Sequence, residues 1–241
     1  MKILYLFILN HFFLPPSLIT DKNIELKFNK ITRENYFIYT ANSNLIQEDY
    51  SLEMLLELLP TQFHERALRY RKEEDVFNFI LGRLMLIEAL VFFDLPISNV
   101  TQLTYTENGQ PLIEGIYFNI SHSGTYVVCA VAKKEAIGID IEVIRPIEIE
   151  HLRKPFTEKE WNIIVKSPNV AQQLLDLWTK KEAVLKLYGA GIGAVEKVDL
   201  VSDAKAIFDQ NNKCTLETII FDDKVLMSIA LGIDETSLAF I

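Results

Sequence analysis

The feature that most constrains the fold is the stretch of residues 73–93, which carries apolar side chains at nearly every helical position. It contains no proline and only one basic residue, Arg83. A helix that is apolar on almost all sides has to be buried on most of them. A second stretch, residues 170–188, also predicts a long helix, and Gly189 follows it as a typical helix stop. The rest of the chain must therefore cover two long helices.

Short segments with strand-like sequences lie before and after each long helix. They are residues 36–40, 103–105, 117–120 and 126–132 in the first half, and residues 136–142 and 225–231 in the second half. The repeated order of strand, helices and strands predicts an α+β fold of two similar subdomains with pseudo-twofold symmetry. We expect one subdomain at residues 1–133, with an N-terminal extension at about 1–33, and the other at residues 134–241.

The composition argues against several classes of protein. The chain has 241 residues, a net charge of −9 and a pI near 5.0, so we expect no nucleic-acid partner. No apolar run reaches the ~18 residues of a membrane span, and we interpret the apolar N-terminus as an extension packed on the domain, with a degenerate export signal as the alternative. Two cysteines without close spacing fit a reducing compartment, so we expect a cytoplasmic location.

Two carboxylates alternate along the expected strand that contains residues 138–142, with the sequence GIDIE. Because alternate residues of a strand point to the same face, Asp140 and Glu142 are expected to lie side by side. Neighbouring carboxylates repel each other, and a divalent cation that prefers oxygen ligands would hold them together. Taken alone, the pair is more typical of a solvated strand end.

The second long helix carries Glu182 and Lys186, which are four residues apart and therefore share one face of the helix. Taken alone, this pair is typical of an exposed ion pair worth ~0.3–0.5 kcal/mol. Before this helix, Thr157 and Glu160 have the spacing of a capping box, which predicts the start of another helix.

The third motif is the sequence FNISHSG at residues 118–124. Its hydroxyls, backbone N–H groups and imidazole can all donate hydrogen bonds to a phosphate, so Ser121 and His122 are candidate phosphate contacts. A hydrolase triad is the rival interpretation, but adjacent residues of an extended segment point in opposite directions, and no GxSxG motif is present. A buried histidine with satisfied hydrogen bonds is the simplest alternative.

Together and in this order, the three motifs resemble the 4'-phosphopantetheinyl transferase superfamily, over roughly residues 36–231. The length of the chain is similar to the Sfp type, which has two subdomains in one chain. The resemblance implies an active site in the cleft between the subdomains. It also implies Mg²⁺-dependent transfer of 4'-phosphopantetheine from coenzyme A to a serine of an apo acyl or peptidyl carrier protein, which releases adenosine 3',5'-bisphosphate. We expect the protein to be a monomer.

The resemblance also implies roles for individual residues. It assigns metal binding to Asp140, Glu142 and Glu182, the general base to Glu182, and stabilisation of the leaving group to Lys186. It assigns phosphate contacts to Ser121 and His122.

The resemblance further places Arg66 near the 3'-phosphate of coenzyme A. Gln110, with Pro111 beside it, stands where the superfamily often has a lysine or arginine at that phosphate. We therefore expect the Gln110 amide to face the 3'-phosphate.

Two other functions share these residues. One is a homologue that binds carrier proteins but has lost turnover, against which the presence of Asp140, Glu142, Glu182 and Lys186 argues. The other is a Mg²⁺-dependent nucleotide pyrophosphatase, which would use the same acids with water as the nucleophile.

Overall fold

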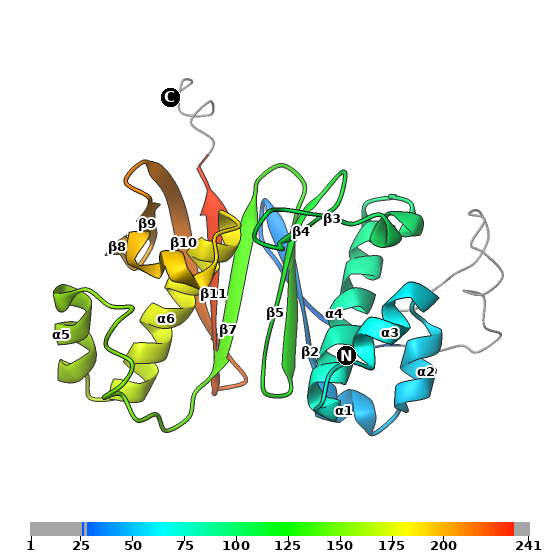
Figure 1. Cartoon of the computed structure of the whole chain (residues 1–241), viewed down its shortest axis with the longest axis horizontal. Helices are drawn as coiled ribbons and strands as arrows, with labels where there is room; N and C mark the ends of the chain where they lie inside the picture. Colours follow the sequence, from blue (N-terminus) through cyan, green and yellow to red (C-terminus); the bar gives the residue numbers. More distant parts are fainter. Residues whose placement is uncertain (1–25, 27, 234–241) are drawn as a thin grey trace.

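The computed structural model describes Leu26 and residues 28–233 (Figure 1). In the first half, the strands are β1 (Asn29–Thr32), β2 (Tyr36–Asn42), β3 (Thr104–Tyr105), β4 (Pro111–Leu112), β5 (Tyr117–Ser123) and β6 (Tyr126–Ala132). The helices of this half are α1 (Ser43–Gln47), α2 (Leu52–Glu57), α3 (His64–Ala67) and the long α4 (Glu73–Phe92), with 3₁₀ turns at Thr61–Phe63 and Ile97–Thr101. The first predicted long helix is therefore confirmed as α4.

The second half also combines strands with helices, one of them long. Its strands are β7 (Ile137–Val143), β8 (Val198–Ser202), β9 (Lys205–Phe208), β10 (Asn212–Phe221) and β11 (Val225–Gly232). Its helices are α5 (Glu158–Lys166) and α6 (Val170–Leu187), with a 3₁₀ turn at Ile192–Lys197. The predicted capping box is present, because Thr157 accepts from the Glu160 N–H while Glu160 accepts from the Thr157 N–H. The second long helix is confirmed as α6.

Within the described residues, the strands form two larger antiparallel sheets and the short β3–β4 hairpin. The first sheet has the order β1-β2-β6-β5, and the second has the order β7-β11-β10-β9-β8. The helices flank the sheets on opposite sides, with α1 to α4 beside the first and α5 and α6 beside the second (Figure 1). Each half combines helices with an antiparallel sheet, which confirms the α+β fold class.

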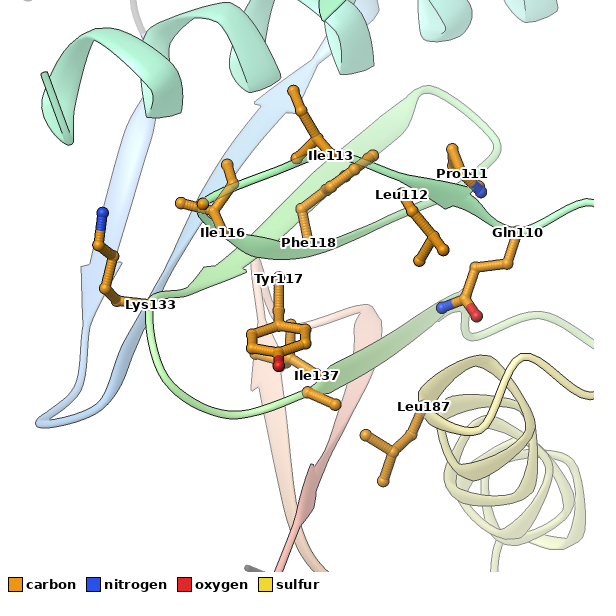
Figure 2. A pocket seen from close by; sticks show the side chains of 12 residues that line it. Gln110, Pro111, Leu112, Ile113, Ile116, Tyr117, Phe118, Lys133, Ile137 and Leu187 are labelled. Atoms are coloured by element: carbon orange, nitrogen blue, oxygen red, sulfur yellow. The ribbon is translucent and has the colours of Figure 1, made fainter. Parts of the chain in front are cut away.

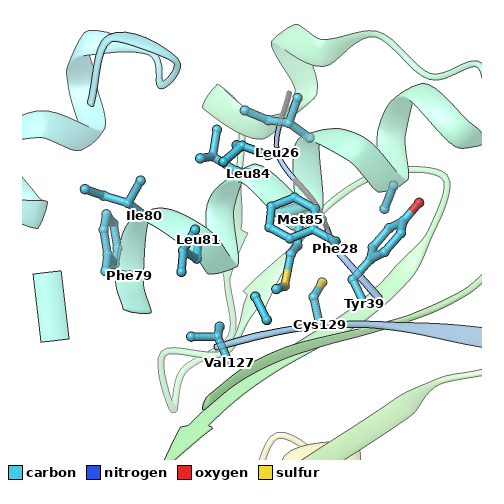
Figure 3. Packing of buried hydrophobic residues seen from close by; sticks show 14 of the residues in the cluster. Leu26, Phe28, Tyr39, Phe79, Ile80, Leu81, Leu84, Met85, Val127 and Cys129 are labelled. Atoms are coloured by element: carbon cyan, nitrogen blue, oxygen red, sulfur yellow. The ribbon is translucent and has the colours of Figure 1, made fainter. Parts of the chain in front are cut away.

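Strand β6 shows how the layers pack. Tyr126, Val128, Ala130 and Ala132 contact the second sheet, whereas Val127, Cys129 and Val131 face helix α4. Because both faces of β6 are buried, its sequence is apolar throughout and does not alternate with polar residues. Figure 3 shows Val127 and Cys129 close to Leu81 and Met85 of α4. Burial in this layer raises the pKa of the Cys129 thiol to about 12.

The edges of the two sheets meet at β5 and β7. Side chains on β5 accept hydrogen bonds from backbone N–H groups of β7: Asn119 from Ile139 at 3.3 Å, Ser121 from Ile141 at 3.4 Å and Ser123 from Val143 at 3.2 Å. The residue numbers of the paired positions increase together along both strands, so β5 and β7 run in parallel. These side chains satisfy donors that an edge strand would otherwise leave without partners.

This arrangement corrects one sequence-based expectation. Ser121 and Ser123 lie within β5 and not in the connection after it, and only Gly124 and Thr125 separate β5 from β6. Most of the expected N-terminal extension, residues 1–25 and 27, lies outside the described residues, and its last part forms β1. The division of subdomains between residues 133 and 134 stays a prediction. Across the described chain, every helix is too short or too polar to span a membrane.

Candidate active site

An acidic pocket of about 330 Å³ lies where β5, β7 and α6 meet. It brings together six residues that the sequence singles out: Ser121, His122, Asp140, Glu142, Glu182 and Lys186. They come from both halves of the chain. We refer to this cavity below as the acidic pocket.

Close contact between β7 and α6 creates this pocket. A Cβ atom at Gly138 would lie 2.1 Å from the carbonyl oxygen of Ala183 and 2.4 Å from the backbone nitrogen of Leu187. Only glycine at position 138 allows the helix to approach the strand so closely. Because of this approach, Glu182 and Lys186 of α6 line the same pocket as Asp140 of β7.

Lys186 is the cation of the pocket. Its Nζ donates to Asp140 Oδ1 at 2.7 Å and to Ser121 Oγ at 3.0 Å. Ser121 in turn donates to Asp140 Oδ1 at 2.9 Å, and Ser123 donates to Glu142 Oε2 at 2.7 Å. The Ser121 hydroxyl is thus already bound to three protein groups, including the Ile141 N–H.

The nearby positive charge does not balance the negative charges of the carboxylates in the acidic pocket. Burial raises the pKa of Glu142, and the charge of Asp140 adds to the rise. Burial also raises the pKa of Glu182, reinforced by the charges of Asp140 and Glu142 and opposed by Lys186. Three carboxylates share a single lysine as their neighbouring cation, and their oxygen atoms are ligands that fit a hard divalent cation.

The three carboxylates do not form a complete metal cage. Among the described residues, no three His, Cys, Asp or Glu side chains converge closely enough to enclose an ion. Mg²⁺ does not require such a cage, because it usually keeps several waters and binds one or two carboxylates together with substrate phosphates. The acidic pocket therefore fits Mg²⁺ as a site that a phosphate ligand completes.

A second cavity, of about 200 Å³, lies between α4, β5 and the β3–β4 hairpin. Its charged lining consists of Arg66 and Arg83, and His122 lines both cavities. The guanidinium carbons of Arg66 and Arg83 lie 5.4 Å and 5.0 Å from the centroid of the Phe79 ring. Partial burial lowers the pKa of His122, which favours the neutral imidazole. We refer to this cavity as the cationic pocket.

Arg83 is a buried cation without a matching anion among the described residues. Only 7% of the residue is exposed, and its Nε–H finds no acceptor among the described residues. Burial and the neighbouring charge of Arg66 lower the pKa of Arg83, and no carboxylate of the described residues is among the groups that shift it. No sequence motif predicts a role for Arg83, although a signal is present: it is the only basic residue of α4.

Comparisons with known proteins identify the family of this chain. The family profile described as the 4'-phosphopantetheinyl transferase superfamily matches residues 136–232, and the profile of a 4'-phosphopantetheinyl transferase N-terminal region matches residues 47–134. The 4'-phosphopantetheinyl transferase HetI of a Nostoc strain is 31% identical over 200 residues, covering 78% of this chain and 84% of HetI. The chain belongs to the 4'-phosphopantetheinyl transferase superfamily.

Two other relatives place it among transferases of the Sfp type. The 4'-phosphopantetheinyl transferase psf-1 of Bacillus pumilus is 29% identical over 191 residues, covering 74% of this chain and 81% of psf-1. The 4'-phosphopantetheinyl transferase Sfp of Bacillus subtilis is 29% identical over 146 residues, covering 58% of this chain and 64% of Sfp. These relatives support the expected transferase activity.

Within this transferase, the remaining site residues separate into two groups. Arg66 and Pro111 line the cationic pocket, as a role near a phosphate requires. Gln110 lines neither that pocket nor the acidic one, because its amide donates to the backbone carbonyl of Lys186 at 2.7 Å. The structure therefore gives Gln110 a protein partner, whereas its expected contact with the 3'-phosphate stays a prediction.

Proposed function

We propose that this transferase moves the 4'-phosphopantetheine group of coenzyme A to a serine of an apo acyl or peptidyl carrier protein. The observation that carries the proposal is that the cationic and acidic pockets adjoin, with Ile120 and His122 of β5 lining both. A substrate with two separate phosphate groups suits such a pair of pockets. In coenzyme A, the 3'-phosphate and the pyrophosphate are such groups.

The cationic pocket is proposed to bind the 3'-phosphate. Guanidinium groups match phosphate oxygens in two-pronged hydrogen bonds, and these charge-assisted bonds are roughly twice as strong as neutral ones. Arg83 is buried and has an Nε–H without an acceptor in the described part of the chain. A phosphate bound in the cationic pocket would supply the missing negative charge.

The acidic pocket is proposed to hold the pyrophosphate through Mg²⁺, with Asp140, Glu142 and Glu182 as candidate ligands. The ion would neutralise charge on the phosphate oxygens. Lys186, now paired with Asp140 at 2.7 Å, is within the same pocket and would donate to the leaving phosphate. His122, at the junction of the two pockets, is placed to donate one N–H to a phosphate oxygen.

In the proposed reaction, the carrier serine Oγ attacks the phosphorus next to pantetheine. The bond between that phosphorus and the bridging oxygen breaks, and the bridging oxygen leaves with adenosine 3',5'-bisphosphate. Glu182 accepts the serine proton, directly or through a water. A positioned general base typically contributes ~10²–10⁴-fold to the rate.

The test is to incubate a panel of apo-carrier proteins with coenzyme A and Mg²⁺ and to measure the mass of each carrier. We expect at least one carrier to gain one phosphopantetheine. Asp140→Ala should lower the rate by roughly 10²–10³-fold, as the loss of a group that stabilises a charged transition state does. The matched control is Asp199→Ala at an exposed site on β8, which should react at the wild-type rate.

The same assay separates the alternatives. Release of adenosine 3',5'-bisphosphate without any carrier would indicate a pyrophosphatase. Tight carrier binding without a mass gain would indicate a homologue that has lost turnover. Normal transfer by Asp140→Ala would refute the role of the acidic pocket.

We further propose that the protein acts as a monomer in the cytoplasm. Both halves of one chain contribute residues to the acidic pocket, so one copy is enough to complete it. The thiols of Cys129 and Cys214 are buried and not joined in a disulfide, which fits a reducing compartment. Light scattering of the purified protein at assay concentration tests the monomer directly, and a dimer mass would contradict it.

A further inference from the structure

The tip of the β3–β4 hairpin, which belongs to the first half, contacts the end of α6 in the second half. The Gln110 amide donates to the Lys186 carbonyl at 2.7 Å, and the Asn108 amide donates to the Gly189 carbonyl at 2.7 Å. Figure 2 shows the Gln110 side chain extending from the hairpin toward the end of α6 near Leu187. We call these two contacts the α6 clasp.

The chemistry of a helix end explains the contact at Lys186, whose carbonyl also accepts from the Gly189 N–H at 3.3 Å, whereas the contact at Gly189 lies two residues past the end of α6. The last four carbonyls of a helix lack partners within the helix, and they form the negative end of its dipole. Side-chain amides that donate N–H groups satisfy these carbonyls. Gly189 has a φ of +61°, and a Cβ atom there would lie 2.5 Å from Gln110 Oε1. Glycine at position 189 thus permits both the end of the helix and the approach of Gln110.

The hairpin tip is held in shape by its own hydrogen bonds. The Thr106 N–H donates to the Gln110 carbonyl at 2.9 Å, and the Gly109 N–H donates to the Thr106 carbonyl at 2.9 Å. The Gln110 N–H donates to Thr106 Oγ1 at 3.0 Å. A tip that is ordered in advance loses little conformational freedom when its side chains bind the helix.

We propose that Gln110, with Asn108, is a positioning residue that holds the last turn of α6 and thereby sets the place of Lys186. This inference rests on the proposed function, because it assumes that Lys186 contacts the reacting phosphate. Helix ends open more readily than helix centres, and Lys186 is the second-last residue of α6. A displacement of about 1 Å in a reacting group can cost as much as 10²-fold in rate.

The clasp assigns Gln110 a role different from a contact with the 3'-phosphate. A residue that binds the 3'-phosphate affects the KM for coenzyme A and has no effect on dephospho-coenzyme A, which lacks that phosphate. A residue that positions Lys186 affects kcat, and it does so equally with both substrates. The two roles can therefore be separated by kinetics.

The kinetic test compares Gln110→Met with wild type on both substrates. We expect kcat to fall about tenfold with either one, which corresponds to ~1.4 kcal/mol and to the loss of one hydrogen bond, while KM stays the same. Gln110→Lys should restore kcat with dephospho-coenzyme A, because an ammonium can donate to the same carbonyl and suits the negative helix end. The matched control is Gln102→Met, the same substitution at an exposed glutamine before the hairpin.

A second readout does not depend on activity. Hydrogen exchange of the backbone amides at residues 183–190 should be faster in Gln110→Met than in Gln102→Met. This measurement tests the clasp even if no carrier is modified, so its failure is distinct from a failure of the proposed function. Unchanged exchange would overturn the clasp. Faster exchange with unchanged kcat, or a loss confined to the KM for coenzyme A, would overturn the positioning role.

Discussion

Lys181 of α6 and Arg83 of α4 are both buried cations of a long helix, but of the two only Lys181 has a buried carboxylate partner in the described part of the chain. Lys181 of α6 is 1% exposed, lies 3.0 Å from Glu160 Oε1 and donates to the Val198 carbonyl at 2.9 Å. Arg83 of α4 is 7% exposed. Among the described residues, no carboxylate shifts its pKa, and no acceptor binds its Nε–H. A buried cation with a carboxylate partner serves the structure, whereas a buried cation that lines a cavity without such a partner indicates a ligand.

The partner of Lys181 has a structural task of its own. Glu160 accepts the Thr157 N–H at 2.7 Å in the capping box of α5. The ion pair therefore ties the start of α5 to the middle of α6. Arg83 instead stacks against Phe79 and faces the cationic pocket together with Arg66. Two like charges beside one cavity repel each other until an anion enters.

The largest expected effect concerns the paired cation. Lys181→Met leaves Glu160 buried and unpaired, and removing one partner of a buried ion pair costs about 3–5 kcal/mol of unfolding free energy. Lys197→Met breaks an exposed pair with Asp209 and should cost below about 1 kcal/mol. Urea unfolding of both variants measures the difference.

A double variant, Lys181→Met with Glu160→Gln, sharpens this prediction. It removes both charges and keeps a side chain that can cap α5, so it should recover most of the lost stability. If Lys181→Met were as stable as Lys197→Met, the buried ion pair would have no structural importance and the comparison would fail.

The next effect concerns the unpaired cation. Arg83→Met should raise the KM for coenzyme A roughly 10- to 100-fold, because charge-assisted hydrogen bonds contribute about 1.5–3 kcal/mol. With dephospho-coenzyme A, the same variant should match wild type. Arg69→Met, at an exposed arginine paired with Glu65, is the control and should change neither KM. Equal losses with both substrates would show that Arg83 does not bind the 3'-phosphate.

The smallest effect has the opposite sign. Arg83→Met replaces a buried charge, which has no partner in the described part of the chain, with an apolar side chain, so the ligand-free protein should become more stable, by up to about 1 kcal/mol. Thermal unfolding without coenzyme A measures this gain as a higher Tm. A lower Tm would show that Arg83 supports the fold, as Lys181 does.

The structural features that the sequence predicts correctly are those that depend on local periodicity. The apolar pattern of residues 73–93 identified α4, and the alternation of residues 138–142 placed Asp140 and Glu142 on one face of β7. The three motifs together also indicated the family, which the comparisons confirm. The metal ligands, the catalytic roles and the subdomain boundary stay predictions.

What the sequence did not predict depends on partners that are far along the chain. Ser121 belongs to β5, where its backbone pairs with Val128 of β6, and the sequence did not show that its hydroxyl would bind β7, 20 residues away. The Gln110 amide finds the Lys186 carbonyl across 76 residues. In the sequence, Arg83 is only an exception in an apolar helix, since a sequence does not show whether a buried cation has a partner.

The central claim is that the cationic pocket binds coenzyme A and the acidic pocket carries out the chemistry. Calorimetric titration of coenzyme A without Mg²⁺ into wild type, Arg83→Met and Asp140→Ala tests it most directly. We predict that Arg83→Met binds roughly 10- to 100-fold more weakly. Asp140→Ala should bind at least as tightly as wild type, because it removes a negative charge near the pyrophosphate. Wild-type affinity in Arg83→Met together with lost affinity in Asp140→Ala would contradict the claim.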